Sequence, residues 1–138
     1  MNKKYMLEAI RQAEKAKETG NVPVGCVIVC NGKIIAKGYN KKNSLKSAIM
    51  HAEIETIDKA CKKLGTWILD ECDLYVTLEP CYMCKGAILE SRIKNVYYIL
   101  PSTYYECIDN SLKKVDFIKI EEFEDYKREF SLFFKNMR

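Results

Sequence analysis

Four residues of the sequence combine metal-binding and proton-transferring side chains: His51, Glu53, Cys81 and Cys84. The two cysteines are three positions apart, so on a helix they lie on one face and can approach the same point. His51 is the only histidine among 138 residues, and it is two positions from Glu53. Imidazole and thiolate groups are preferred zinc ligands, and three such ligands leave a fourth position open, as in catalytic sites. The pattern predicts a catalytic zinc site with Glu53 beside it.

Glu53 is predicted to move protons and not to bind the metal. Zinc lowers the pKa of a bound water molecule, and a neighbouring carboxylate can take the proton that this water loses. On residue type alone, Glu53 could instead be a solvated first-turn glutamate that complements a helix dipole. A lone histidine such as His51 is also often no ligand at all. The combination of both residues with the paired cysteines favours the catalytic interpretation.

Helices and strands are expected to alternate along the chain. Apolar residues at helical spacing predict an opening helix that ends near Gly20, and Asn31-Gly32 predicts a tight turn between two strands buried on both faces. The later elements are expected at 51–64 (helix), 74–78 (strand), 81–91 (helix), 95–100 (strand), 115–120 (strand) and 121–136 (helix). His51 and Cys81 thus stand at the starts of two helices. The alternation predicts an α/β protein, a three-layer α/β/α sandwich with a mixed five-stranded sheet, and leaves open the direction of the last strand.

Length and composition favour one globular domain over residues 1–138. No segment approaches the roughly 18 apolar residues of a membrane-spanning helix, and no secretory signal is recognised, so no membrane partner and a cytoplasmic location are expected. Disulfides are rare in the cytoplasm. The remaining cysteines are expected as reduced thiols, with Cys26, Cys30 and Cys61 buried and Cys72 and Cys107 in connections. The net charge of +4 neither requires nor excludes a nucleic-acid partner.

The sequence resembles the cytidine-deaminase-like superfamily, and within it the bacterial tRNA adenosine deaminases, which convert the wobble adenosine of an anticodon to inosine. The similarity runs from the first helix through the fourth strand and is most specific in Asn21–Gly25, His51–Glu53 and Thr77–Ile88. Zinc deaminases of nucleobases carry this His-x-Glu and Pro-Cys-x-x-Cys pattern, with the glutamate as general acid and base. The resemblance implies Zn²⁺ on the histidine and the two cysteines, hydrolytic deamination with release of ammonia, and a homodimer.

The resemblance also implies how a substrate is held. Asn40 matches the asparagine that contacts the nucleoside, although an asparagine there could simply form a turn. Ala52 would offer its backbone amide to the ring. The chain end, Phe133–Arg138, is similar to the aromatic and basic tail with which tRNA deaminases approach the anticodon stem, but its phenylalanines could equally be core packing.

Three segments depart from the family pattern. Ser47–Met50 replaces Asp-Pro-Thr-Ala before the histidine, and Tyr82 replaces a proline between the cysteines. Pro101–Cys107 replaces a Gly/Ala-rich loop that helps surround the flipped anticodon, and Tyr104 and Tyr105 could stack on bases there or pack within the loop. The expected substrate is a tRNA anticodon stem-loop, with a free nucleobase or nucleoside as the alternative. A non-catalytic, zinc-stabilised RNA-binding subunit is a third hypothesis, which the retained glutamate disfavours.

Overall fold

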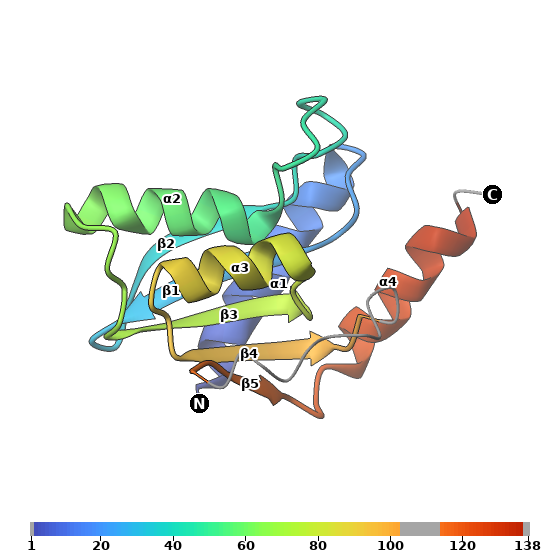
Figure 1. Cartoon of the computed structure of the whole chain (residues 1–138). Coiled ribbons are helices and arrows are strands. Elements are labelled where there is room, and N and C mark those ends of the chain that lie inside the picture. The colour runs from blue at the N-terminus through green and yellow to red at the C-terminus, as the bar shows by residue number, and fades with distance from the viewer. Residues whose placement is uncertain (1, 103–113, 137–138) are drawn as a thin grey trace.

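The computed structural model describes residues 2–102 and 114–136. These residues form α1 (Lys3–Glu18), β1 (Gly25–Cys30), β2 (Lys33–Tyr39), α2 (Ala52–Leu64), β3 (Cys72–Leu78), α3 (Tyr82–Glu90), β4 (Asn95–Leu100), β5 (Asp116–Lys119) and α4 (Glu124–Asn136) (Figure 1). None of the helices within the described ranges is both long and apolar enough to cross a membrane.

The five strands form one mixed sheet in the order β2-β1-β3-β4-β5. β1 is antiparallel to both β2 and β3, whereas β3, β4 and β5 run parallel to one another. This arrangement decides the direction of the last strand, which the sequence pattern had left open. The parallel strands bring their carboxyl ends to one edge of the sheet, where ligands of open α/β sheets commonly bind.

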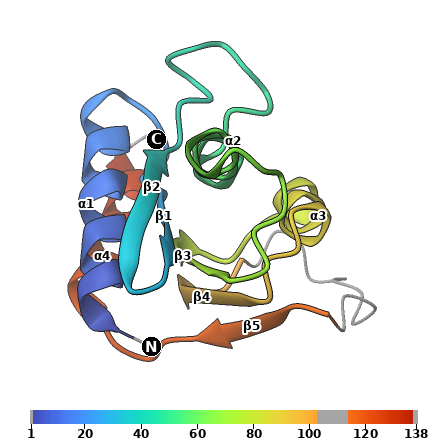
Figure 2. The same cartoon turned by 90° about the vertical axis from the view of Figure 1, so that its left-hand side faces the viewer.

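Helices cover both faces of the sheet. α1 and α4 lie on one face and α2 and α3 on the other, as Figure 2 shows end-on. Two hydrophobic clusters follow from this: α2 and α3 pack over β1, β3 and β4 in one, and α1 and α4 pack over the opposite face in the other. The predicted three-layer α/β/α sandwich is therefore confirmed.

Two local sequence signals form the structures that they predicted. Asn31 and Gly32 join β1 to β2 with φ angles of 52° and 76°, the left-handed pair that a type I′ turn requires. Gly65 ends α2 with a φ of 68°, and its N–H donates to the carbonyl of Cys61. α2 therefore begins directly after His51 and ends at the predicted glycine cap.

Three expectations about burial and boundaries are wrong. β2 is an edge strand with a mixed burial pattern, so only β1 of the hairpin is buried throughout. Cys30 and Cys61 are partly exposed, whereas Cys72 is a buried residue of β3 and not part of a connection. The closing helix begins at Glu124 and not at residue 121, because Phe123 has a φ of 69°, which a right-handed helix does not tolerate.

A chain of buried hydrogen bonds attaches α4 to the sheet. The Tyr126 hydroxyl donates to the Pro23 carbonyl at 2.7 Å and lies 2.9 Å from the Thr77 hydroxyl. Because the single proton of Tyr126 goes to Pro23, Thr77 supplies the proton of the second bond. Thr77 in turn accepts the N–H of Gly25 at 3.1 Å. Every link has a donor and an acceptor.

We expect Tyr126→Phe to lower the free energy of unfolding by about 1–3 kcal/mol, because a buried carbonyl and a buried hydroxyl each lose a partner. Urea denaturation of the zinc-loaded protein measures the change. Tyr97→Phe is the matched control, since the described residues include no hydrogen-bond partner of its hydroxyl, and it should shift stability by less than about 0.5 kcal/mol. Equal effects of both substitutions would contradict the hydrogen-bond chain.

Candidate active site

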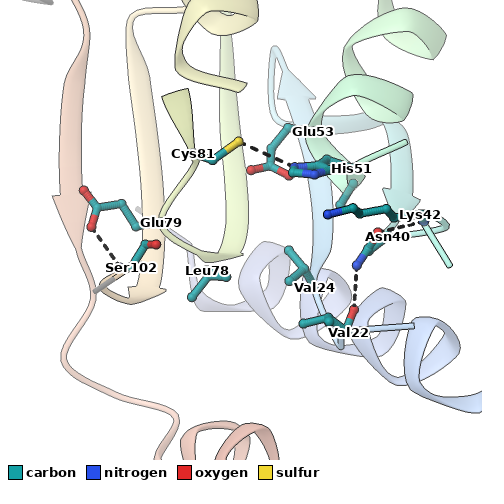
Figure 3. A pocket seen from close by; sticks show the side chains of 11 residues that line it. Val22, Val24, Asn40, Lys42, His51, Glu53, Leu78, Glu79, Cys81 and Ser102 are labelled. Carbon is teal, nitrogen blue, oxygen red and sulfur yellow. Dashed lines mark hydrogen bonds between the residues drawn. The ribbon is translucent and has the colours of Figure 1, made fainter. Parts of the chain in front are cut away.

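His51, Cys81 and Cys84 meet at the N-terminal ends of α2 and α3. His51 is the extended residue before α2, with φ −77° and ψ 156°, and Cys81 has the same position before α3, with φ −73° and ψ 178°. Nδ1 of His51 lies 3.6 Å from the Cys81 sulfur and 3.5 Å from the Cys84 sulfur. Figure 3 shows the Cys81 sulfur pointing at the imidazole ring. The structure thus brings together the three residues that were predicted as ligands.

The geometry of this group fits a zinc ion. The three ligand atoms lie within 4.8 Å of one another, and no further His, Cys, Asp or Glu of the described ranges joins them. Zn–S and Zn–N bonds of about 2.3 and 2.0 Å at tetrahedral angles separate nitrogen from sulfur by about 3.5 Å. The measured separations agree with that value. The residues can therefore hold zinc while leaving its fourth position to a non-protein ligand.

The thiols of Cys81 and Cys84 have pKa values shifted in opposite directions. The bond from the Cys84 thiol, together with His51, lowers the pKa of Cys81 to about 4. The same bond and burial raise the pKa of Cys84 far above the usual thiol value. Cys81 is thus a thiolate at neutral pH, and a divalent cation would displace the proton that Cys84 keeps. The positive ends of the α2 and α3 dipoles favour the added negative charge.

Glu53 lies in the first turn of α2 and faces the protein interior. Only 4% of its surface is exposed, so it is not the solvated first-turn glutamate considered above. Burial raises the pKa of its carboxyl to about 7. A carboxyl group that titrates near neutrality can both accept and donate a proton. In Figure 3 the carboxyl lies beside His51 and Cys81, where it can reach a molecule bound next to them.

A pocket opens beside these residues at the carboxyl end of β3. Its lining consists of Val22, Val24, Asn40, Lys42, His51, Ala52, Glu53, Leu78, Glu79, Cys81 and Ser102. Asn40 and Ala52, the two residues expected to contact substrate, are both included. The Asn40 side chain also donates to the Val22 carbonyl at 3.2 Å and accepts the Lys42 N–H at 3.0 Å. Asn40 therefore lines the pocket and stabilises a turn at the same time.

The buried Lys85 and the partly buried Glu79 form an ion pair at the wall of the pocket. Lys85 is 3% exposed, and its ammonium lies 3.1 Å from one Glu79 oxygen and 4.6 Å from the centre of the Phe117 ring. The other Glu79 oxygen accepts the Ser102 N–H at 3.1 Å, and the Glu79 N–H donates to the Leu100 carbonyl. The pair attaches the end of β4 to the turn that carries Cys81. Sequence reasoning missed it, and the available signal was weak: one lysine among small and apolar residues of a helix.

Lys85→Met should destabilise the fold by about 3–5 kcal/mol, because the Glu79 carboxylate then stays largely buried without its cation. The double variant Glu79→Gln/Lys85→Met removes both charges and should recover most of this loss. Guanidinium denaturation of the wild type and both variants gives the comparison. A single variant no less stable than the double variant would show that the pair contributes little.

Of the described residues that depart from the family pattern, only Ser102 lines the pocket. Tyr82 is the first residue of α3 and is 47% exposed, and Ile49, within the Ser47–Met50 segment, is 56% exposed. Pro101 and Ser102 begin the replaced loop, and Ser102 lines the pocket. Residues 103–107, with both tyrosines and the cysteine discussed above, lie outside the described ranges.

The aromatic residues near the end of α4 are partly packed and partly exposed. Phe130 packs against the two hydrophobic clusters of the core, and its ring centre is 5.1 Å from that of Phe134. Phe134 is nevertheless 46% exposed at the end of α4. One part of the tail is therefore packing, and another part presents an aromatic ring to solvent. Residues 137 and 138 lie outside the described ranges.

Residues 1–100 match the family described as the cytidine and deoxycytidylate deaminase zinc-binding region. The match includes both helix starts that carry the candidate ligands and ends with β4. The fold and the zinc-compatible ligand set agree with this description. The chain belongs to this family.

The most informative relatives are deaminases of two kinds. Over 94 residues, or 68% of the chain, the sequence is 53% identical to the tRNA-specific adenosine deaminase of Bacillus subtilis (strain 168), and the aligned part spans 58% of that protein's length. A structure from work on A-to-I editing by tRNA:A34 deaminases matches with a TM-score of 0.79 and 35% identity, over 86% of this chain and 98% of the other. The Bacillus subtilis guanine deaminase structure matches with a TM-score of 0.71 and 31% identity, over 98% of this chain and 95% of the other.

Proposed function

We propose that this protein is a zinc-dependent hydrolytic deaminase that converts the wobble adenosine of a tRNA anticodon to inosine. The observation that carries the proposal is the pair of 3.5 and 3.6 Å separations between His51 Nδ1 and the two cysteine sulfurs, with the buried Glu53 carboxyl beside them. A ligand set of this kind with a proton-transferring carboxyl is the machinery of hydrolytic deamination.

The chain's own residues have separate tasks in this reaction. His51, Cys81 and Cys84 hold the zinc, which when bound acidifies a water molecule so that it attacks at neutral pH. Glu53 takes one proton from that water as the oxygen bonds to the amine-bearing carbon of adenine, and passes this proton to the adjacent ring nitrogen. Glu53 then carries the second water proton to the amine. The carbon–nitrogen bond breaks, ammonia leaves, and a carbonyl group remains.

Two features support tRNA as the substrate. Over 94 residues the chain is 53% identical to a tRNA-specific adenosine deaminase. α4 carries the exposed Phe134, and its basic residues Lys127, Arg128 and Lys135 line one hollow, in which Lys127 and Arg128 pair with Glu124 and Asp125. Such groups are suited to stacking and to phosphate contact. Asn40 and the Ala52 backbone are proposed to hold the nucleoside.

The test uses zinc-loaded protein and a tRNA with adenosine at the wobble position. Sequencing after incubation should detect inosine at that position and unchanged adenosines elsewhere in the molecule. A transcript with guanosine at the wobble position serves as the control. No conversion by protein that contains one zinc per chain would refute the assignment.

The likeness to a guanine deaminase favours a second candidate, deamination of a free nucleobase or nucleoside. That structural match covers 98% of this chain, whereas the structural match to the tRNA:A34 deaminase covers 86%. Ammonia release from guanine, adenine, cytosine and their nucleosides tests it directly. Release from one of these compounds, with no change in tRNA, would replace the first candidate by the second.

We also propose that the chain is a single catalytic domain that works as a homodimer in the cytoplasm. Exposed Ile49 and Tyr82 flank the site in the sequence and offer apolar surface to a second subunit. Light scattering coupled to size-exclusion chromatography should give twice the chain mass of 16.0 kDa. A monomeric mass at micromolar concentration would contradict the dimer.

A further inference from the structure

One side chain in the pocket carries a positive charge that no described acidic group neutralises. Lys42 is the only lysine or arginine of the pocket lining, and its ammonium has no ion-pair partner in the described ranges. The preceding Lys41 differs, because it pairs with Glu55 and lies over the Tyr39 ring. Figure 3 shows the Lys42 side chain extended along the pocket toward His51.

The backbone beneath Lys42 is held by two buried asparagines. Asn40 accepts the N–H of Lys42 at 3.0 Å, and Asn21 accepts the N–H groups of Asn43 and Ser44 at 2.8 and 3.0 Å. Asn21 is completely buried. Three successive amides are therefore bound by side chains, and the start of the Lys42 side chain is fixed relative to the pocket. A preorganised cation loses less entropy when it binds a ligand.

The charge of Lys42 has no counterpart on a free base or nucleoside. The described lining has two acidic residues: Glu79 lies across the pocket and is paired with Lys85, and Glu53 forms no ion pair with Lys42. A nucleotide, in contrast, carries a phosphate ester on the ribose next to its base, and ammonium groups are common phosphate partners.

We propose that Lys42 is a phosphate-binding residue, which pairs with a phosphate ester attached to the nucleoside in the pocket and so favours nucleotides and RNA over free nucleosides. This inference rests on the proposed deaminase function and adds a specificity determinant to it.

Lys42→Gln and Lys46→Gln form the test pair, because both remove one positive charge from the same loop but only Lys42 lines the pocket. kcat/KM is measured with adenosine, adenosine 5′-monophosphate and an anticodon stem-loop RNA. Lys42→Gln should lower kcat/KM for the phosphate-bearing substrates about tenfold, as expected for the loss of one charge-assisted hydrogen bond. The loss should be much smaller with adenosine, and Lys42→Arg should retain most of the activity. Lys46→Gln should change none of the three values by more than about twofold.

Salt dependence gives a second measurement that needs no turnover. Binding of the labelled stem-loop to zinc-loaded Glu53→Gln protein should show a log–log salt slope that is lower by about 0.7 when Lys42→Gln is added, which corresponds to one single-strand phosphate contact. A salt slope that Lys42→Gln leaves unchanged overturns the proposal. So does an equal loss of kcat/KM for adenosine and RNA, or an equal effect of Lys42→Gln and Lys46→Gln.

The substrates also separate this proposal from the tRNA assignment. If the wild type deaminates nucleosides and not RNA, the tRNA function fails, and the comparison of adenosine with its 5′-monophosphate still decides the role of Lys42. If Lys42→Gln lowers kcat/KM for both the monophosphate and the RNA, the partner of Lys42 is the 5′-phosphate of the reacting nucleotide. If the substitution lowers kcat/KM for the RNA alone, the partner is a phosphate of a neighbouring nucleotide.

Discussion

Glu53→Gln is expected to lower kcat for deamination by about 10²–10⁴-fold while the protein keeps its zinc. Glutamine has nearly the same shape as glutamate, so the buried position stays filled. It cannot take a proton from water or return one to the leaving amine. Single-turnover kinetics with the substrate that the deamination assays select, together with metal analysis of the same sample, separates loss of chemistry from loss of metal.

Glu55→Gln is the matched control for this experiment. Glu55 lies two residues further along α2, binds Lys41, and does not line the pocket. Its substitution should leave kcat within a few-fold of the wild-type value. Full activity of the Glu53→Gln protein would instead support a non-catalytic, zinc-stabilised RNA-binding subunit, the third hypothesis from the sequence.

Cys84→Ser is expected to abolish both zinc binding and activity. Cys84 is buried, and its sulfur lies 3.5 Å from His51 Nδ1, so no other described residue is in position to replace it. A serine hydroxyl does not ionise near neutral pH and is a poor zinc ligand. Metal analysis should find almost no zinc, and deamination should fall to the background rate.

Removing zinc from the wild-type protein and adding it back also tests the proposed ligands. Chelation should lower the melting temperature of the wild type, because zinc that binds only the folded state adds about 4 kcal/mol at a free concentration 1,000 times its Kd. Returned zinc should restore both the melting temperature and the activity. Cys61→Ser is the control, since Cys61 is a partly exposed residue of α2 outside the ligand group. A Cys84→Ser protein with normal zinc content and activity would refute the proposed ligand set.

The chemistry of the site could be predicted because its evidence is local in the chain. The spacing of Cys81 and Cys84 defines one face of a helix turn, and His51 and Glu53 are separated by only one residue. Turn and cap signals are local for the same reason: Asn31-Gly32 and Gly65 each adopt backbone angles that few other residues tolerate. Patterns of this range depend on neighbouring residues alone, and the structure reproduces them.

Features that depend on residues far apart in the sequence could not be predicted in this way. The parallel direction of β5, the mixed burial of edge strand β2 and the pairing of Glu79 with Lys85 all result from packing between separate elements. A hydrophobic pattern describes which face of a strand is apolar, but not which strand lies beside it. A lone lysine in a helix likewise does not reveal a buried partner.

The candidate active site likewise combines features that are local in the sequence with features that depend on the fold. The residue types and short spacings of His51, Glu53, Cys81 and Cys84 were sufficient to suggest zinc and proton transfer. The 3.5–3.6 Å separations across 30 or more residues of chain arise only because the sheet brings the starts of α2 and α3 together. Burial of Glu53 and the orientation of Lys42 toward the pocket are further results of that packing. Side-chain chemistry is a property of each residue, whereas distance and burial are properties of the folded chain.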